Sequence, residues 1–555
     1  MKEKLKHIFL VLTPSEKKQF WIQIVLNIFI SVADIAALAF LLLVVNFYIN
    51  ISSSTILDFL PTWLLDKNSI ALISIFFIFF SLKNLIGIFI SNAQYKFIGK
   101  VGVRISKQKL ESYLNGGYDQ FVNVDSAEHI RKIAFQPFEF SQHILGGIQQ
   151  IIIQLFLILI TIVAILLFNP QLFFLLLVIL LPPVALVFFF IKRKVSSGKK
   201  NIHAANESSF RYLLDALKGY VESNIHQRKE FFLERFTNAR QEFSKYLFNS
   251  LAVQAMPSRI IESFAVLGLF ILIIIVKWSG TDDSSMLLTV GAFMAGAYKI
   301  IPGIVKIINA SGQMKAYEFS IYDLGIKKET NSSEKVSQLT SIESVQLKNI
   351  SFQYGDHHIL NDLSFCITKG DFIGIAGKSG RGKTTILNLI LGFLAPSRGE
   401  VLINNNNVSN DLLKDHWPTI SYVRQQPFLI HDTILKNITL EENIYDKKRF
   451  EQAIEISGLK KLIDQSIEGI NKLITENGKN ISGGQQQRIA IARTLYKDAE
   501  LFLLDEPFNE LDEASTLSLV KYFKELSSSG KMVIMVTHDA KCLSFCNKII
   551  SLDEQ

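Results

Sequence analysis

A glycine-rich loop in the second half of the chain has the residue types needed to hold phosphate groups. It reads Gly377-Lys378-Ser379-Gly380-Arg381-Gly382-Lys383-Thr384 and lies between a short apolar run and a helical run that starts at Thr385. Glycines let backbone N–H groups turn toward phosphate oxygens, and the start of the helix adds its dipole. The lysine of such a loop reaches the β- and γ-phosphates, and the hydroxyl after it can bind Mg²⁺. The loop predicts ATP and Mg²⁺ as cofactors, with contacts from Gly377, Ser379, Gly380, Gly382, Lys383, Thr384 and Thr385.

Two acidic residues follow a second apolar run. Residues 501–504 are apolar, and Asp505 and Glu506 come directly after them. A carboxylate at the end of a buried strand can hold Mg²⁺ through water, and the next one can polarise the attacking water. An apolar run that ends in two acids is weak evidence by itself, but downstream of a phosphate-binding loop it indicates nucleotide hydrolysis.

Five further features between residues 354 and 538 resemble motifs of the ATP-binding cassette (ABC) ATPases. Ile481-Ser482-Gly483-Gly484-Gln485 resembles the ABC signature, with isoleucine for the usual first leucine. Asn509-Glu510-Leu511-Asp512 occupies the D-loop, where exporters more often have Ser-Ala-Leu-Asp. Tyr354, Gln425 and His538 resemble the adenine-stacking aromatic, the Q-loop glutamine and the switch histidine. Together with the phosphate loop and the acidic pair, seven motifs follow one another in the family's order.

The resemblance implies a role for each of these residues. The catalytic residues would be Glu506, His538 and Gln425, and the Mg²⁺ ligands would be Thr384, Gln425 and Asp505. The remaining nucleotide contacts would come from Tyr354, Ser482, Gly483, Gly484, Gln485, Asp505 and Asp512.

The resemblance also implies that the chain works as a dimer. In this family the signature of one subunit caps the ATP that is held by the phosphate loop of the other subunit. Every ATPase residue is present, including Glu506, which favours a homodimer with two competent sites. The altered D-loop leaves a heterodimer as the alternative.

The first half of the chain has the composition of a membrane domain. The 555 residues are 49% hydrophobic, and the mean hydropathy is +0.27. Each of six apolar stretches is long enough to cross about 30 Å of hydrocarbon at 1.5 Å per residue. They are residues 20–47, 69–95, 141–168, 171–191, 257–276 and 286–310. The net charge is +8, but the basic residues lie beside apolar segments, so we predict no nucleic-acid partner.

The distribution of lysine and arginine predicts the orientation in the membrane. Basic residues are frequent in the amino-terminal tail, between spans two and three and between spans four and five, whereas the opposite side has only Lys67 and Lys277. Positive loops stay in the cytosol. We therefore predict a multi-pass protein of a bacterial cytoplasmic (inner) membrane, with both termini and the ATPase domain in the cytosol. The three cysteines would be reduced thiols.

These patterns define a multi-domain membrane protein. We expect an all-α six-helix transmembrane domain with long cytosolic extensions at 1–326, a polar linker at 327–343 and an α/β P-loop ATP-binding domain at 344–555. This order of domains resembles the type I ABC exporters, in which short helices near 118–124 and 215–223 would couple the two domains. No peptidase domain is appended, which disfavours an exporter that cleaves leader peptides.

Four charged residues lie near mid-depth of the predicted spans, namely Asp34, Lys83, Glu262 and Lys299. A charge at the bilayer centre costs about 2.5–3.5 kcal/mol on insertion scales, so such residues should face a cavity or each other. They could form structural pairs, such as Asp34 with Lys83, or line a cavity in which the two lysines bind an anionic headgroup. In the second case Asp34 and Glu262 would neutralise the lysines when the cavity is empty.

An acid in span one, a base in span two and Tyr298-Lys299-Ile300-Ile301-Pro302 in span six resemble the bacterial lipid-linked oligosaccharide flippases. That resemblance implies ATP-driven flipping of an amphiphilic or lipid-linked substrate, with membrane lipid as a partner. A peptide exporter and a drug or lipid exporter remain alternatives. A soluble ABC ATPase is incompatible with six spans.

Overall fold

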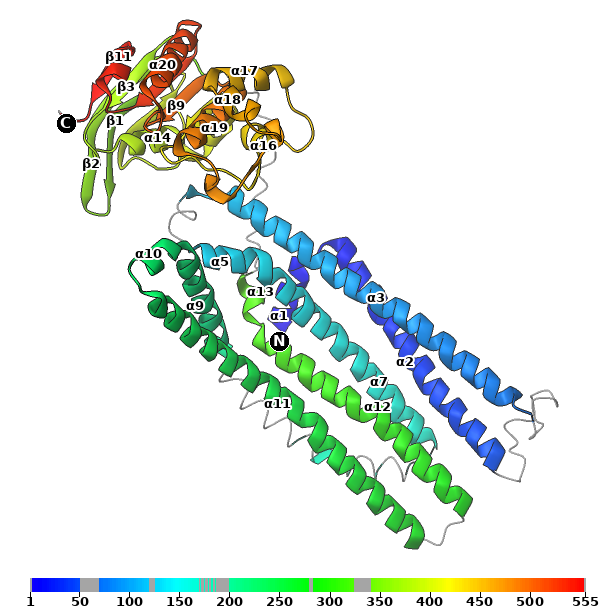
Figure 1. Cartoon of the computed structure of the whole chain (residues 1–555). Coiled ribbons are helices and arrows are strands. Elements are labelled where there is room, and N and C mark those ends of the chain that lie inside the picture. Colours follow the sequence, from blue (N-terminus) through cyan, green and yellow to red (C-terminus); the bar gives the residue numbers. More distant parts are fainter. Residues whose placement is uncertain are drawn as a thin grey trace. The chain divides into compact units, whose positions relative to one another are not determined.

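The computed structural model describes residues 2–49, 69–118, 125–168, 199–278, 283–323 and 341–553, together with isolated positions between 170 and 185. The chain forms two compact units (Figure 1). One consists of Met1–Gly116 and Gln120–Glu329, and the other of Gly117–Asp119 and Thr330–Gln555. Each unit has its own layers and its own core.

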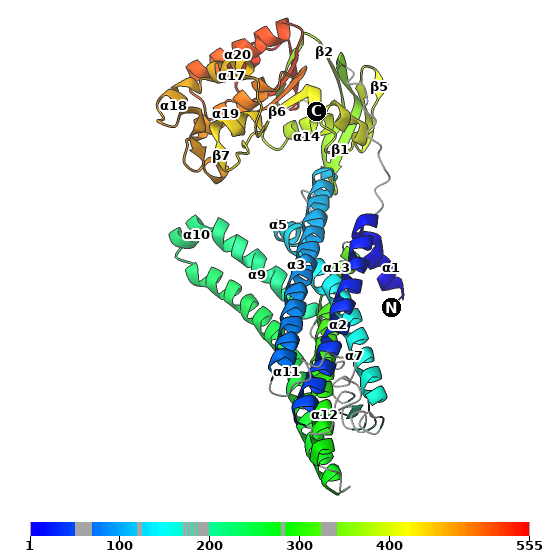
Figure 2. The same ribbon diagram turned by 90° about the vertical axis from the view of Figure 1, so that its right-hand side faces the viewer.

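All regular secondary structure in the described residues of the first unit is helical. Figures 1 and 2 show its long helices side by side, and α12 packs on α7, α11 and α2. The helices are α1 (Lys2–Val11), α2 (Pro14–Ile49), α3 (Ala71–Leu114), α5 (Ser126–Ile130), α6 (Gln136–Glu139), α7 (Gly146–Phe168), α9 (Lys199–Lys218), α10 (Tyr220–Ile225), α11 (Lys229–Trp278), α12 (Asp283–Ala316) and α13 (Phe319–Asp323), with π-helical turns at Arg131–Phe135 and Phe140–Leu145.

Five of the six predicted spans lie in helices that are apolar and long enough to cross a membrane. These segments are Pro14–Val45, Ala71–Leu114, Ser126–Leu167, Ser258–Ile275 and Val290–Ala316. The fourth predicted span, 171–191, lies largely outside the described residues, as does most of the predicted coupling segment 118–124. Large apolar side chains such as Phe77, Phe89 and Leu167 are exposed on these helices, which suits contact with lipid rather than water.

Two helices are much longer than a bilayer is thick. Helix α3 has 44 residues and α11 has 50, so at 1.5 Å per residue they extend roughly 66 and 75 Å. Hydrocarbon accounts for about 30 Å of such a length. The rest of each helix forms the extension that the sequence predicts, and α9 packs along α11 in the same region.

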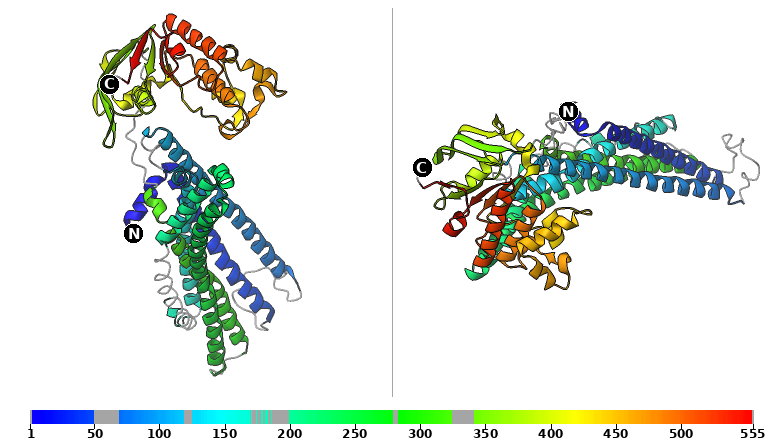
Figure 3. Two further views of the ribbon diagram at one scale, coloured as in Figure 1. Left: turned by 60° about the vertical axis from the view of Figure 1, so that its left-hand side comes forward. Right: turned by 90° about the horizontal axis from the view of Figure 1, so that it is seen from above.

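The second unit is an α/β domain with two larger sheets (Figure 3). A four-stranded sheet has the order β2-β1-β4-β5, and its strands are β1 (Ser344–Tyr354), β2 (His357–Thr368), β4 (Arg398–Ile403) and β5 (Asn406–Asn407). A parallel sheet has the order β11-β3-β10-β9-β6, and its strands are β3 (Phe372–Ala376), β6 (Ile420–Val423), β9 (Leu501–Asp505), β10 (Met532–Val536) and β11 (Lys548–Ser551). A short ribbon pairs β7 (Asp432–Thr433) with β8 (Leu473–Ile474).

Helices cover both faces of the parallel sheet, so its strands are apolar on both sides. Leu503 and Ile534 pack in one core with Leu387. Phe502 and Val533, one residue away on the same strands, pack in another core with Phe523. The helices of this unit are α14 (Lys383–Ile390), α15 (Asn410–Leu413), α16 (Ile434–Thr439), α17 (Lys447–Ser457), α18 (Lys460–Asp464), α19 (Gly483–Tyr496), α20 (Glu513–Ser528) and α21 (Ala540–Leu543).

The register of the parallel strands brings the predicted motifs to one edge. Ile375 of β3 and Asp505 of β9 both pair with Val536 of β10, and Leu504 pairs with Val423 of β6. In open α/β sheets ligands bind outside the carboxyl ends of the strands. The residues that follow these strand ends, Gly377, Glu506, His538 and Gln425, are therefore carried to the same edge.

Candidate functional site

The phosphate loop leads from β3 into α14 and needs its glycines. Gly380 and Gly382 have φ angles of +83° and +88°, in the region that glycine adopts without strain. A Cβ atom on Gly382 would also lie 2.6 Å from Cγ2 of Ile359. Two independent constraints therefore require glycine at the residue directly before Lys383.

Lys383 and Thr384 lie against the acidic pair. The Lys383 ammonium donates to the carbonyl oxygen of Gly377 at 2.8 Å and lies 3.5 Å from Oε1 of Glu506. The Thr384 hydroxyl donates to Oδ2 of Asp505 at 2.9 Å. The structure thus brings together the lysine, the hydroxyl and both carboxylates, which the sequence placed in segments more than 100 residues apart.

The surroundings of the Asp505 carboxylate suit the binding of a divalent cation. Burial raises the pKa of Asp505, and the hydrogen bond from Thr384 and one with Tyr422 lower it in part. A divalent cation beside such a group favours its charged form. A hydroxyl and a carboxylate are oxygen ligands of the kind that Mg²⁺ takes in nucleotide sites, so the donor set fits this ion.

Three donors surround the carboxylate of Glu506. Its Oε2 atom accepts from Nε2 of Gln425 at 3.0 Å and from Nδ2 of Asn509 at 2.7 Å, while Lys383 lies on the Oε1 side. Glu506 has φ +48°, a strained angle for a side chain of this size. Its amide donates to the carbonyl oxygen of Val536 at 3.0 Å, which holds the residue at the sheet edge. Sequence reasoning gave Asn509 no role at this carboxylate.

The signature segment forms the start of α19. Ser482 is the N-cap, and it exchanges hydrogen bonds with Gln485 in a capping box, at 3.3 and 3.1 Å. Asp512 caps the next helix, α20, and lies 3.3 Å from the Arg488 guanidinium of α19. Among the described residues of one chain, no hydrogen bond or ion pair joins the signature to the phosphate loop.

Tyr354 and His538 are both exposed. Tyr354 ends β1, is 51% exposed and packs its edge against Phe352 at a centroid distance of 4.8 Å. An exposed aromatic face suits stacking on a base. His538 is exposed and follows the end of β10 after one residue.

The membrane helices hold a cluster of charges. Asp34 of α2 forms ion pairs with Lys83 of α3 and with Lys299 of α12, the latter at 3.2 Å. The side chains are 22%, 7% and 18% exposed, respectively. Two ammonium groups thus share one carboxylate. The predicted pair of Asp34 with Lys83 is present, and Lys299 joins it.

Glu262 does not belong to this cluster, so the prediction that it helps to neutralise the lysines is wrong for the single chain. Its carboxylate accepts from the Ser258 hydroxyl at 2.7 Å and lies 3.9 Å from the Arg259 guanidinium. All three residues lie on α11, and Glu262 is 55% exposed. Mid-depth position along a span does not determine which side of the helix a residue occupies.

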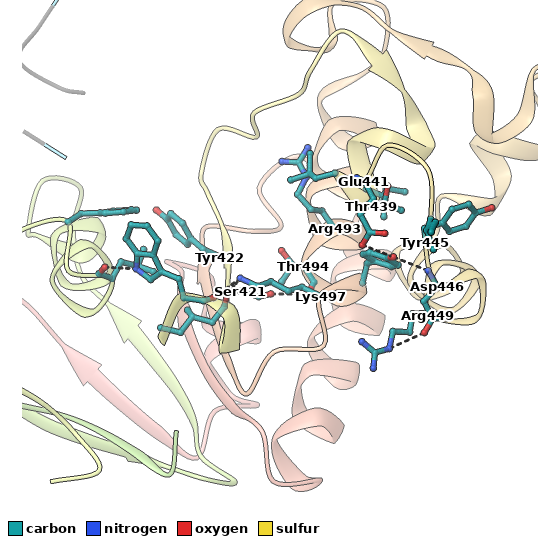
Figure 4. A pocket seen from close by; sticks show the side chains of 18 residues that line it. Ser421, Tyr422, Thr439, Glu441, Tyr445, Asp446, Arg449, Arg493, Thr494 and Lys497 are labelled. Atoms are coloured by element: carbon teal, nitrogen blue, oxygen red, sulfur yellow. Dashed lines mark hydrogen bonds and ion pairs between the residues drawn. The ribbon is translucent and has the colours of Figure 1, made fainter. Parts of the chain in front are cut away.

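Cavities are also present away from the predicted nucleotide residues. A groove of 830 Å³ is lined by Tyr422, Tyr445, Arg493 and Lys497 among others (Figure 4), and it contains none of the predicted ATP contacts. A smaller apolar pocket of 160 Å³ lies between α2, α7 and α12. Its wall includes Ile35 and Gly296, close in sequence to Asp34 and Lys299. An apolar cavity therefore lies near the charged cluster.

The chain matches known families over most of its length. Residues 360–509 match the ABC transporter family, and residues 20–296 match the ABC transporter transmembrane region. This chain belongs to the ABC transporter family. In this ABC transporter the transmembrane region precedes the ATPase domain in the same chain.

Curated relatives of this ABC transporter include a general ABC transporter protein and a lipid A-core flippase. A "Probable ABC transporter ATP-binding/permease protein" of Haemophilus influenzae is 26% identical over 349 residues, 62% of each chain. An "ATP-dependent lipid A-core flippase" of Burkholderia pseudomallei is 25% identical over 360 residues, 63% of this chain and 60% of the relative. The alignments span less than two thirds of the length of these relatives.

A solved structure of a bacterial Atm1-family ABC exporter with ATP bound has the same fold. The TM-score is 0.77, with 98% of this chain and 94% of that chain covered at 17% sequence identity. The predicted fold class, a type I ABC exporter with a P-loop ATPase domain, is confirmed.

Proposed function

We propose that this ABC transporter is an ATP-driven exporter or flippase that works by alternating access as a homodimer. It would lie in a bacterial cytoplasmic membrane with both termini and the ATPase domain in the cytosol. The observation that carries the proposal is the meeting of Lys383, Thr384, Asp505, Glu506 and Gln425 at one edge of the parallel sheet.

The arrangement of these side chains supports a hydrolytic role. Lys383 donates to the Gly377 carbonyl oxygen and forms an ion pair with Glu506, and it would turn to the β- and γ-phosphates when ATP fills the loop. Thr384, Asp505 and Gln425 would hold Mg²⁺, which supplies charge neutralisation for the phosphoryl group. Once Lys383 and Gln425 have new partners, the Glu506 carboxylate would still accept from Asn509, and its other oxygen could orient water and accept its proton.

The signature supports a shared site. Ser482, Gly483 and Gly484 begin α19, and a helix start attracts anions. They do not bond to the phosphate loop of their own chain within the described residues. A second copy of the chain would place this helix start over the ATP of its partner, and the interface would be symmetric.

The charged cluster supports an anionic, amphiphilic substrate. Lys83 and Lys299 carry two positive charges against the single negative charge of Asp34, and an excess ammonium in a membrane is costly unless an anion offsets it. Phosphate binds ammonium groups through charge-assisted hydrogen bonds. The apolar pocket between α2, α7 and α12 offers space for part of a chain. A lipid-linked oligosaccharide or a related anionic lipid has both properties.

Transport in proteoliposomes tests the proposal. The purified protein should show ATPase stimulation and flipping with an anionic lipid-linked sugar, and less with a neutral lipid, a peptide or a hydrophobic drug. Lys299→Gln should abolish the flipping but leave basal ATPase intact. Lys306→Gln is a matched control, because Lys306 lies on α12 like Lys299 but is exposed.

A different substrate preference would contradict the proposed anionic lipid substrate. If peptides or hydrophobic drugs stimulate the ATPase and anionic lipids do not, the chain is a peptide or multidrug exporter.

A further inference from the structure

The side chain of Glu510, in the D-loop (residues 509–512), contacts the signature segment (residues 481–485). Oε2 of Glu510 lies 2.9 Å from the position that a Cβ atom of Gly483 would take, and the Glu510 carbonyl oxygen lies 2.7 Å from the same position on Gly484. Glu510 thus contacts the first two residues of α19. The positive end of a helix dipole favours a carboxylate at this place.

The position of Glu510 is well defined by its neighbours. Phe508 is buried, and its carbonyl oxygen accepts from the Leu511 amide at 3.0 Å. Asp512 then caps α20. Because both sides of the turn are anchored, Glu510 should stay with the signature when the signature moves.

Glu510 has no ionic partner in its own chain among the described residues, and it is exposed. In the proposed dimer the signature of one subunit faces the phosphate loop of the other. Glu510 would then also lie at the partner's phosphate loop, next to the negatively charged triphosphate of ATP. Two like charges at short range repel each other by several kcal/mol unless a cation lies between them.

The phosphate loop offers two exposed cations for this purpose. Lys378 and Arg381 are exposed, whereas Lys383 is buried against Glu506. The Lys378 amide donates to Oδ1 of Asp553 at 3.0 Å, so Lys378 has an acid of its own chain beside it. Arg381 makes no ion pair among the described residues. A guanidinium can also form a two-pronged pair with a carboxylate.

We propose that Arg381 of each subunit pairs with the partner subunit's Glu510 when the ATP-bound dimer closes. The inference rests on the proposed function, because it assumes the shared site. It makes Arg381 and Glu510 determinants of pairing. Two copies of this chain form the ion pair twice, so the preferred partner is an identical chain.

Charge reversal tests the pair in the full-length protein. Glu510→Arg should raise the ATP concentration for half-maximal ATPase about tenfold or more, which is within the range of charge pairs across interfaces. Arg381→Glu should do the same, and the double variant should recover most of the loss. The variant Lys378→Glu with Glu510→Arg is the matched control and should recover nothing. Normal ATPase in Glu510→Arg, or recovery only with the lysine variant, would overturn the assignment.

Cysteine crosslinking tests the same pair without relying on charge. A chain with Arg381→Cys and Glu510→Cys should be linked into a dimer by a short bis-maleimide reagent with Mg²⁺ and ATP, and much less without them, because two long paired side chains hold their Cα atoms farther apart than a direct disulfide can span. Burial raises the pKa of Cys542 and Cys546 to about 12, so at neutral pH these thiols react slowly. Only the exposed Cys366 needs replacement by serine. Absence of the ATP-dependent crosslink would also overturn the assignment.

The proposed function can fail separately. A mixture of Lys383→Ala and Ser482→Arg chains tests the shared site with Arg381 and Glu510 unchanged. If that mixture is active and the crosslink is absent, only the ion pair is wrong. If the mixture is inactive and no crosslink forms, the shared site itself is wrong.

Discussion

The charge cluster predicts an unequal response to the loss of its members. Asp34 is the single acid between Lys83 and Lys299 in the described membrane helices, so Asp34→Asn leaves two ammonium groups without a counter-charge. Removal of one partner from a buried ion pair costs about 3–5 kcal/mol. Lys299→Gln leaves the Asp34–Lys83 pair in place and should cost about 1.5 kcal/mol, close to one charged hydrogen bond. Lys83→Gln should cost more than Lys299→Gln, because Lys83 is less exposed.

Thermal unfolding of the purified protein in detergent measures these differences. Asp34→Asn should unfold several degrees below Lys299→Gln, which should unfold slightly below the unmodified protein. Glu262→Gln is the matched acid control. Glu262 contacts only residues of its own helix in the described part of the chain, so this variant should unfold like the unmodified protein. An Asp34→Asn protein as stable as Glu262→Gln would refute the reasoning, because the lysines would then not depend on Asp34.

Two further predictions concern the ATPase site. Glu506→Gln should bind ATP with little change but lower kcat by about 10²–10⁴-fold, the usual contribution of a general base, and should accumulate a closed dimer; near-normal turnover would remove Glu506 from this role. Because burial raises the pKa of Asp505, protons should compete with Mg²⁺, and ATPase activity should fall as the pH drops through that pKa. Tyr422→Phe removes a hydrogen bond that lowers this pKa, so the acidic limb of the pH profile should move to higher pH, whereas Tyr445→Phe should leave it in place. An unchanged limb in Tyr422→Phe would contradict the assignment.

The sequence singled out the phosphate loop and the acidic pair that the structure brings together, because the determinants of these motifs are local. A phosphate loop needs glycines at fixed positions before a lysine, and the φ angles of Gly380 and Gly382 show why. Asp505 and Glu506 follow an apolar run of a length typical of a buried strand, and the run forms β9. The parallel pairing of β10 with both β3 and β9 then brings the phosphate loop and the acidic pair to the same edge of the sheet.

The contacts between distant side chains could not be predicted in this way. Depth along a span suggested that Glu262 belongs with Lys83 and Lys299, but depth says nothing of the side of the helix, and Glu262 pairs within α11. The contacts of Asn509 with Glu506 and of Glu510 with Gly483 depend on the turn between β9 and α20. The sequence analysis identified the D-loop but gave neither Asn509 nor Glu510 a contact.

A mixing experiment tests the central claim, that two copies of this chain share each ATP site. Lys383→Ala and Ser482→Arg chains should each be inactive alone. In a mixed dimer, the Lys383 of one chain and the Ser482 of the other form one intact site, so random pairing should restore about one quarter of the intact sites of the unmodified dimer. ATPase activity near that level is the predicted result. No activity in a mixture whose mixed dimers are demonstrated by crosslinking would contradict the account.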